Sequence, residues 1–372
     1  MSDISSIFRK WFASIDQFLL FTVLIIIAIG IWVSITSTPA IALKLELEPF
    51  HFAKQHIALI PIVLVLIAVI SSFQPKHIRL LSLLGYLGSI VLIICTMLFG
   101  TEIKGAKRWI NIFGFSLQPS EFLKPVLTIL TAWLISEQYK NAKFQGIFMS
   151  LISICLVLPL LLLQPDVGMT LVIVTTWLAQ LFISGLSITM ILTFIFSSIG
   201  ALSGLYFIFP HFTDRVNRFF GSNGEDTDLY QIHKSLEAFK NGGWFGKGPG
   251  EGTVKMNVPD CHSDFIFSVI GEEFGLLVCI IIIFLFVILA LRPLIKVLKS
   301  SSMFCYSAVF GIVFQIILQI TINISTALNL IPTKGMTLPF ISYGGSAMLS
   351  SAINIGFLLV LTKYDSLMYE EI

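Results

Sequence analysis

The longest stretch of this sequence without a formal charge covers residues 167–213, 47 residues in all. A membrane-spanning helix needs about 20 mainly apolar residues, so the stretch is too long for one such helix and long enough for two. The Gly-Leu-Ser sequence at 185–187, near its middle, is typical of a turn. The stretch therefore predicts two helices that cross a membrane, at 167–184 and 188–209.

Similar apolar stretches recur along the whole chain. Hydrophobic residues make up 56% of the sequence and charged residues only 12%, whereas soluble domains carry about 25% charged residues. Inside a lipid bilayer, only helices and closed β-barrels can satisfy the hydrogen bonds of their backbone groups. The continuous apolar runs lack the alternation of apolar and polar residues that barrel strands show. The predicted fold class is an all-α polytopic membrane protein, one domain over 1–372 with ten transmembrane helices. The predicted spans are 18–35, 57–73, 80–100, 119–134, 144–163, 167–184, 188–209, 265–291, 303–328 and 343–361.

The longest connection between predicted spans is an extracytoplasmic loop at 210–263, between the seventh and eighth helices. Within it, Leu229, Ile232, Leu236 and Phe239 recur three and four residues apart. This spacing gives a helix one apolar face. The loop is therefore expected to contain an interfacial helix that lies on the membrane surface.

The distribution of basic residues favours both termini in the cytoplasm. With this orientation, the short cytoplasmic segments hold ten Lys and Arg residues and the short outer loops hold six, in line with the usual excess of basic residues on the cytoplasmic side. Three of the outer residues, Lys104, Lys107 and Arg108, form a cluster against this trend. Either a bound anion or contact of these side chains with lipid headgroups would account for it.

Glu121, Lys124 and Asp166 are ionisable residues that lie inside or directly before predicted spans in the first half of the chain. Glu121 and Lys124 are three residues apart on the 119–134 helix, after the good helix-starting sequence Pro119-Ser120. They form either a structural ion pair or part of a polar substrate site, because charged residues in a span usually face the protein interior or a wet cavity. Asp166 either caps the next helix or belongs to the same outer polar cavity.

The sequence GGWFGKGPGEG at 242–252 has six glycines in eleven residues. It resembles a phosphate-binding loop only superficially, because Lys247 is followed by Gly248 instead of Ser or Thr and no strand is predicted before it. Glycine more often permits tight turns and close approach of two backbones. We therefore expect a packing role for these glycines.

The chain is organised around the stretch PDCHSDFIFSVIGEE at 259–273, where a polar loop runs into an apolar helix that still carries acids. Ser263 or Asp264 could simply cap that helix. Alternatively, Asp264 lies at the outer mouth of the bundle, where partial burial would raise its pKa and suit a general base. Glu272 and Glu273 lie two turns deeper and are expected to bind polar partners inside the bundle.

Four motifs together resemble the SEDS family of cell-wall polymerases, and within it the cell-division branch. They are GAKRWINIFGFSLQPSEFLKP, QPDVG, GKGPGEGTVKMNVPDCHSDFIFSVIGEEFG and IPTKGMTLPFISYGGS. The motifs extend over residues 105–346, and the PTKG sequence that begins at Pro332 resembles the division branch more than the elongation branch. One departure is Ala347, where the family commonly has a second serine, so a hydroxyl role at this position is absent here.

The resemblance implies a peptidoglycan glycosyltransferase that polymerises lipid II on the outer face of the bacterial cytoplasmic membrane, at the division septum. Asp264 corresponds to the family's catalytic aspartate in a His-Thr-Asp-Phe pattern, written here with Ser263 in place of Thr. It would remove the proton from the acceptor 4-hydroxyl as that oxygen attacks the donor, so that undecaprenyl diphosphate leaves and the donor linkage is inverted. His262, in the same motif, is a candidate substrate-binding residue.

The resemblance also assigns the charged residues and the partners. Arg108, Glu121 and Lys124 match polar positions of the family's central cavity. Lys107, Arg108 and Lys334, or a divalent cation such as Mg²⁺ or Mn²⁺, would stabilise the diphosphate leaving group; no other cofactor is implied. The expected partners are a class B penicillin-binding transpeptidase and other divisome proteins, and no nucleic acid.

Two other functions remain open from the sequence. The same cavity and charges could carry lipid II across the membrane, as in a flippase. Against transport, the sequence has no evident internal repeat, and its polar groups concentrate at the outer side instead of the midplane. The elongation-type polymerase of the same family is the second alternative.

Overall fold

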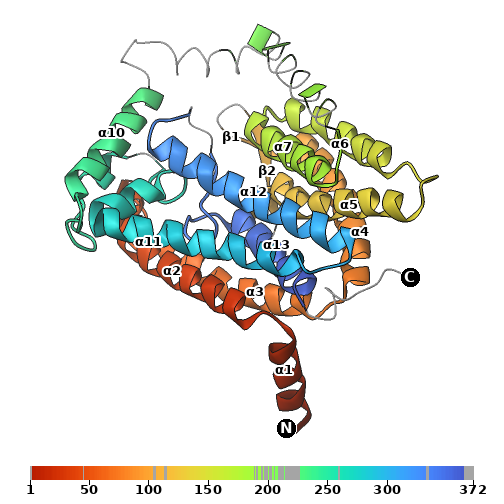
Figure 1. Cartoon of the computed structure of the whole chain (residues 1–372). Coiled ribbons are helices and arrows are strands. Elements are labelled where there is room, and N and C mark those ends of the chain that lie inside the picture. Colours follow the sequence, from red (N-terminus) through yellow and green to blue (C-terminus); the bar gives the residue numbers. More distant parts are fainter. Residues whose placement is uncertain are drawn as a thin grey trace.

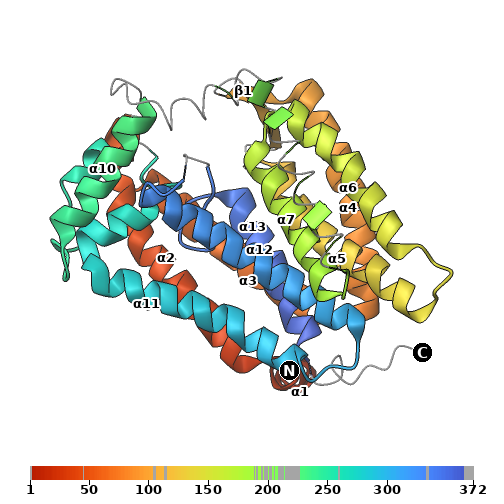
Figure 2. The same cartoon turned by 45° about the horizontal axis from the view of Figure 1, so that its top comes forward.

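The computed structural model describes residues 2–44, 46–103, 106–112, 115–187, 227–258, 260–331 and 335–363, with scattered residues between 189 and 213. These residues form a bundle of helices with one small sheet (Figure 1). The helices are α1 (Ser2–Ser14), α2 (Gln17–Lys44), α3 (His51–Ser71), α4 (Pro75–Phe99), α5 (Pro119–Lys140), α6 (Gly146–Leu163), α7 (Val167–Ile183), α10 (Thr227–Gly242), α11 (Ile266–Val297), α12 (Met303–Ala327) and α13 (Gly345–Leu361), with a short 3-10 helix at Val254–Asn257. Helix α10 and strand β1 (Thr101–Ile103) lie at one end of the bundle and α1 at the other (Figure 2).

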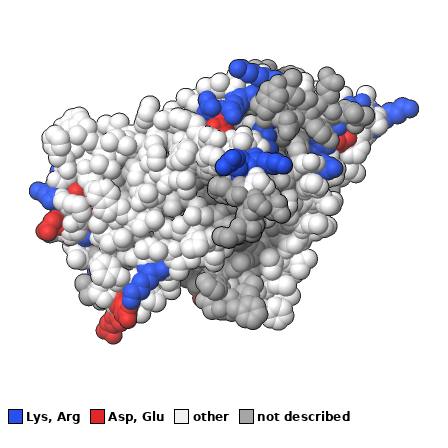
Figure 3. Space-filling view, turned by 90° about the horizontal axis from the view of Figure 1, so that it is seen from below, with Lys and Arg blue, Asp and Glu red and all other residues white. Residues whose placement is uncertain are grey.

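Most helices of the described chain are apolar and suited to contact with lipid. Six of them are long and apolar enough to cross a membrane, namely α2, α3, α4, α6, α11 and α12, and the apolar helices α7 and α13 are somewhat shorter. Large apolar side chains such as Leu98 (67% exposed) and Phe284 (62%) cover the outside of the bundle. On the face shown in Figure 3, broad uncharged areas separate small clusters of charged side chains. The chain is therefore a multi-pass membrane protein.

Nine of the predicted spans overlap these helices, and most of the remaining span, 188–209, lies outside the described residues. The turn predicted at 185–187 is present, since α7 ends at Ile183 and Gly185 has a φ of 81°. The all-α prediction is wrong in one place. A three-stranded antiparallel sheet is formed by β1, β2 (Ala106–Ile112) and β3 (Phe115–Leu117). These short extended segments satisfy one another's backbone groups, a pairing that the apolar residues of this stretch did not indicate.

Helix α5 lies at the centre of the bundle. It packs against α4, α6, α7, α12 and α13, and side chains on all its sides are buried, including those of Leu123, Ile129 and Ala132. A helix surrounded by protein does not need an apolar surface toward lipid. This position explains why a transmembrane helix of this chain carries Glu121 and Lys124.

Helix α11 is broken at Gly275, whose φ of 79° and ψ of 177° lie in a region that only glycine readily adopts. The glycine-rich loop 242–252 fills the break with backbone hydrogen bonds. The four bonds run from Lys247 N to Glu272 O (3.0 Å), from Gly248 N to Glu273 O (3.0 Å), from Leu276 N to Gly243 O (3.0 Å) and from Leu277 N to Trp244 O (3.3 Å). Unpaired backbone groups are costly at membrane depth. The bonds with the loop satisfy backbone groups on both sides of the break, and so allow the turns of α11 before Gly275 to be separated from its lipid-facing part.

Two glycines of this loop, Gly242 and Gly246, are needed for the close approach of two backbones. A Cβ atom added to Gly242 would lie 2.0 Å from Gly271 O, and one added to Gly246 would lie 2.2 Å from Glu273 O. Real Cβ atoms do not approach backbone atoms so closely. The packing role predicted for these glycines is therefore confirmed.

Substitution of Gly275 by Ala is expected to lower the unfolding temperature at least twice as far as Gly243→Ala. A Cβ on Gly243 (φ 58°) meets nothing within 4 Å, so this control variant carries only the cost of a left-handed residue, about 1–2 kcal/mol. A Cβ on Gly275 would also lie 2.4 Å from Trp244 O. Thermal unfolding of both purified variants in detergent tests this, and equal shifts would contradict the clash.

The opposite end of α11 is held by an ion cluster around Asp16. Its Oδ2 accepts hydrogen bonds from Arg292 Nε and Lys296 Nζ, both at 2.9 Å. Burial by itself would raise the pKa of this carboxyl group, but the hydrogen bonds to Lys296 and Arg292 outweigh burial and hold the pKa below its ordinary value of 3.8. The cluster therefore stabilises the folded chain above that pH, and this contribution is lost as the pH falls through the lowered pKa.

Asp16→Asn is accordingly expected to destabilise the protein at neutral pH by about 1 kcal/mol, because both basic partners are partly exposed. The difference in unfolding temperature between the two proteins should shrink as the pH is lowered below 3.8. A difference that stays constant from neutral to acid pH would show that the charge of Asp16 is not what stabilises this end of the bundle.

Candidate active site

Helices α5, α7, α11 and α13 begin at the same end of the bundle as α3 does, and contacts between the residues around the N-termini of these four helices bring them together. Gln118, before α5, donates its backbone N–H to Ser346 Oγ of α13 (2.9 Å) and its side-chain amide to Asp166 Oδ2, before α7 (3.4 Å). Tyr343, before α13, donates its backbone N–H to His262 O, before α11 (2.9 Å). Because helix N-termini carry partial positive charge, this end of the bundle favours anionic groups.

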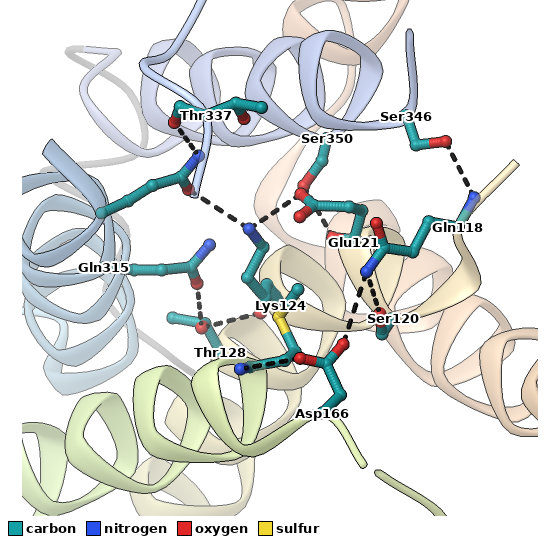
Figure 4. A network of polar contacts seen from close by, with 12 residues as sticks. Gln118, Ser120, Glu121, Lys124, Thr128, Asp166, Gln315, Thr337, Ser346 and Ser350 are labelled. Carbon is teal, nitrogen blue, oxygen red and sulfur yellow. Dashed lines mark hydrogen bonds and ion pairs between the residues drawn. The ribbon is translucent and has the colours of Figure 1, made fainter. Parts of the chain in front are cut away.

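Asp166 satisfies both of its predicted roles. Its Oδ1 accepts a hydrogen bond from Met169 N (3.3 Å) and so caps α7. Its Oδ2 faces Gln118 (Figure 4). Arg108 lies 3.9 Å from Oδ1. The cap is therefore also part of the polar cluster at the outer end.

Strand β2 places the two described members of the basic cluster differently. Arg108 donates from Nε to Gln164 O (3.0 Å) and from a second guanidinium nitrogen to Pro165 O, so it holds the turn before α7 as well as pairing with Asp166. Lys107 is exposed, and its carbonyl oxygen accepts a hydrogen bond from Gln164 Nε2 (3.0 Å). Of the two, Lys107 is thus the one whose side chain is exposed, while Arg108 contributes its charge from a fixed position.

Glu121 and Lys124 form the predicted ion pair, with 2.8 Å between Lys124 Nζ and Glu121 Oε2. Lys124 is only 2% exposed, and its ammonium group also donates to Gln319 Oε1 of α12 (3.2 Å; Figure 4). Deeper along α5, a small polar cavity lies between Lys124, Thr128, Thr176 and Gln180. The cavity has room for about one water molecule. The Glu121–Lys124 pair is a structural ion pair, and it lies between this cavity and the polar cluster around Gln118 and Asp166.

Asp264 is not the cap of α11, because the N-cap residue is Phe265 and this position makes no side-chain cap hydrogen bond. The Asp264 carboxyl group faces the 335–337 segment (Gly335, Met336 and Thr337): a Cβ added to Gly335 would lie 3.1 Å from Asp264 Oδ2. The side chain is half-buried. Of the two predicted roles, the structure therefore disfavours capping. It leaves the carboxyl group next to the residues that follow Lys334, which itself lies outside the described residues.

His262 is fixed by aromatic neighbours. Its ring stacks on Phe52 of α3, with 4.9 Å between ring centroids, and lies 5.6 Å from the ring of Tyr343. Burial lowers the pKa of His262 below its usual value, although the charge of Asp260 acts in the opposite direction. Within the described chain its buried Nδ1 has no hydrogen-bond partner. A neutral imidazole at pH 7 suits hydrogen bonding to a sugar better than pairing with a diphosphate.

Glu272 and Glu273 bind the loop that precedes Asp264. Glu272 accepts three hydrogen bonds of 2.8 Å, from Asn241 Nδ2, Val254 N and Lys255 N. Glu273 forms a buried ion pair with Lys255, whose Nζ also donates to Thr36 O of α2 (3.0 Å). The predicted role of the two acids inside the bundle is confirmed, and both act through the loop instead of through another membrane helix.

Sequence reasoning did not single out Lys255, Gln319 and Asn323. Asn323 of α12 donates to the backbone oxygens of Asp264 (3.0 Å) and Met336 (2.7 Å). The available signal was the pair of amides four residues apart in an otherwise apolar span, since polar residues in a span usually face the bundle interior. No group of three or more His, Cys, Asp or Glu side chains that could hold a metal ion occurs among the described residues.

Comparisons with known proteins agree with this arrangement. The family profile described as "Cell cycle protein" (FtsW, RodA and SpoVE) matches residues 16–367. A probable peptidoglycan glycosyltransferase FtsW of Caulobacter vibrioides is 40% identical over 316 residues, which are 85% of this chain and 80% of that protein. The corresponding protein of Trichlorobacter lovleyi is 35% identical over 280 residues, 73% of each chain.

Solved structures share the fold. One, described as "Structural coordination of polymerization and crosslinking by a peptidoglycan synthase complex", has a TM-score of 0.78 at 22% identity and covers 94% of this chain and 98% of its own. The rod shape determining protein RodA of Thermus thermophilus has a TM-score of 0.68 at 23% identity, with 94% and 98% covered. Because the family profile covers nearly the whole chain, the resemblance predicted from the motifs is confirmed, and the chain belongs to the SEDS family, the FtsW, RodA and SpoVE group of cell cycle proteins.

Proposed function

We propose that this chain is a peptidoglycan glycosyltransferase that polymerises lipid II during cell division, with Asp264 as the general base. The observation that carries the proposal is the position of Asp264, whose carboxyl group lies at the junction that starts α11 and faces the 335–337 segment instead of capping the helix. The names of the FtsW relatives support the reaction and favour the division branch over the elongation branch.

The site residues have complementary roles in this reaction. Asp264 takes the proton from the 4-hydroxyl of the acceptor GlcNAc, and the resulting oxygen nucleophile attacks the anomeric carbon of the donor MurNAc. The bond from that carbon to undecaprenyl diphosphate breaks, so the α linkage becomes β. His262, as a neutral ring, binds the sugar.

Negative charge on the leaving diphosphate is met by Lys107 and Lys334, by the fixed charge of Arg108 and by the N-termini of α5, α7 and α13. The Glu121–Lys124 pair maintains a polar floor beneath them. A divalent cation bound to the diphosphate would add charge of the same sign at the same place.

The proposed topology has ten spans, the 210–263 loop outside and both termini in the cytoplasm. Three observations support it: the bias of basic residues, the position of α1 opposite α10 and β1 (Figure 2), and the clustering of helix N-termini at the α10 end. The partner of this proposal is a class B penicillin-binding transpeptidase, with other divisome proteins at the septum. The solved complex that couples polymerization with crosslinking supports this partnership.

A reconstituted assay tests the proposal against lipid II transport. The purified chain with its transpeptidase, placed in proteoliposomes with labelled lipid II, is expected to produce glycan strands that a muramidase digests. Label that crosses the bilayer without glycan product would instead identify a flippase.

A further inference from the structure

Three buried amides follow one another on the same face of α12. Gln315, Gln319 and Asn323 are spaced four residues apart, so they lie above one another along the helix. All three are at most 4% exposed. Amide side chains in a membrane-spanning helix are costly unless their hydrogen bonds are satisfied. Their partners therefore indicate what this face of α12 does.

Asn323 joins two segments at the outer mouth. Its Nδ2 donates one hydrogen bond to Asp264 O (3.0 Å) and one to Met336 O (2.7 Å). An amide nitrogen has two hydrogens, so one side chain fixes both backbones at once. The carboxyl group of Asp264 faces Gly335, the residue before Met336, so Asn323 lies directly beneath this pair of segments.

Gln319, one turn deeper, connects the same segment to the buried ion pair. Its Nε2 donates to Thr337 O (2.8 Å), and its Oε1 accepts from Lys124 Nζ (3.2 Å; Figure 4). Because an ammonium group only donates, Lys124 fixes the amide orientation and turns the nitrogen toward Thr337. A continuous chain of contacts thus runs from Glu121 through Lys124 and Gln319 to the 335–337 segment.

Two further contacts hold the same segments from above. Ser342 Oγ donates to Ser263 O (2.7 Å) and accepts from Leu338 N (2.8 Å). With Asn323 and the bond from Tyr343 N to His262 O, the loop that carries Asp264 is bound at three successive residues. A base held so firmly by its backbone is pre-organised for proton transfer, since a displacement of about 1 Å can cost about 10²-fold in rate.

We propose that Asn323 and Gln319 are positioning residues of the polymerase reaction. They hold the backbone of Asp264 and the 335–337 segment at a fixed place above the Glu121–Lys124 pair. They touch neither sugar nor diphosphate and act through Asp264 and through the segment that follows Lys334. The effect of this inference on the rate of polymerisation rests on the proposed function. Its effect on the positions of the two segments rests on geometry alone.

The kinetic test compares Asn323→Leu and Gln319→Leu with Gln315→Leu. Gln315 is a matched control because it is equally buried on the same helix face, yet its oxygen is bonded only to Thr128 Oγ1 (2.9 Å) among the described residues and reaches neither outer segment. The two test variants are expected to lower kcat for lipid II polymerisation about 10- to 100-fold with KM nearly unchanged. Gln315→Leu is expected to stay within about threefold of the unmodified protein. Equal losses in all three variants would overturn the proposal, because they would indicate a general packing defect.

Asn323→Asp provides a readout that loss of packing would not give. An ionised carboxylate cannot donate to the oxygens of Asp264 and Met336, whereas a protonated one can donate to one of them. The ratio of variant to unmodified activity is therefore expected to rise as the pH is lowered. A ratio that is constant across the pH range would contradict a role of Asn323 as a donor.

Hydrogen exchange separates this inference from the proposed function. In Asn323→Leu, backbone amides in the peptides 260–268 and 335–343 are expected to exchange at least tenfold faster, while Gln315→Leu leaves them unchanged. If the unmodified protein makes no glycan but exchange changes in this way, the function is wrong and the positioning of the two segments stands. If glycan is made and neither exchange nor kcat responds to Asn323→Leu, the positioning role is wrong and the function stands.

Discussion

Replacement of Asp264 by Asn is expected to lower the initial rate of lipid II polymerisation about 10²- to 10⁴-fold, the usual contribution of a general base. The amide keeps the size of the side chain and its place beside Gly335, but it cannot accept the proton of the acceptor hydroxyl. The α11 junction should remain intact, because Phe265 and not Asp264 is its N-cap. Substrate binding is therefore expected to change much less than kcat.

The measurement is the initial rate of glycan formation by the purified chain with its transpeptidase partner. Asp260→Asn is the matched control, because it removes a carboxyl group four residues away in the same loop. Asp260 has a φ of 49°, a conformation that Asn tolerates well, so this variant is expected to polymerise within about threefold of the unmodified rate. Full activity of Asp264→Asn would remove Asp264 from the catalytic role.

Lys255→Met is expected to reduce the free energy of unfolding by about 3–5 kcal/mol, the cost of leaving one partner of a buried ion pair alone. Lys255 is 3% exposed and Glu273 is 1% exposed. Without the ammonium group, the carboxylate of Glu273 loses its cation, and the carbonyl oxygens of Thr36 and Gly250 lose a donor. The outer loop, which leads directly to Asp264, is then expected to detach from α11 and α2.

Thermal or denaturant unfolding in detergent, followed by tryptophan fluorescence, measures this effect. Two further variants serve as controls. Lys54→Met breaks the ion pair with Glu48, in which both side chains are largely exposed, so it is expected to change the stability far less than Lys255→Met does. The double variant Lys255→Met with Glu273→Leu removes both charges and is expected to recover part of the loss. If Lys255→Met cost no more than Lys54→Met, the buried pair would not be what holds the loop.

Features determined by neighbours in the chain were predicted correctly from the sequence. Helix α5 begins at Pro119, Asp166 caps α7, and Gly185 ends the same helix, because each depends on the conformation or hydrogen bonding of a few adjacent residues. The apolar spans could be predicted for the same reason. Lipid imposes helix on any continuous apolar run, whatever its partners are.

The acids of the 259–273 stretch show where prediction from sequence stopped. The motif identified Asp264, but capping and catalysis were both compatible with a carboxylate before a helix. The N-cap position of Phe265 disfavours capping, and catalysis stays a proposal. The partners of Glu272 and Glu273 lie 17 to 31 residues earlier, at Asn241 on α10 and at Val254 and Lys255 in the loop that follows it. The sequence around these two acids does not specify their partners, because basic side chains and backbone N–H donors are available at many positions of the chain.

The sequence by itself therefore determined the membrane fold class, the family and the candidate base. Only the tertiary structure decided how the site is assembled: the break of α11 at Gly275, the sheet at 101–117, and the amides of Gln319 and Asn323 beneath the 335–337 segment. The physical reason is the range of the interactions. Apolar spans, caps and turns follow from hydration and local geometry, whereas the contact between Lys124 and Gln319 joins residues 195 positions apart and exists only once α5 and α12 have packed together.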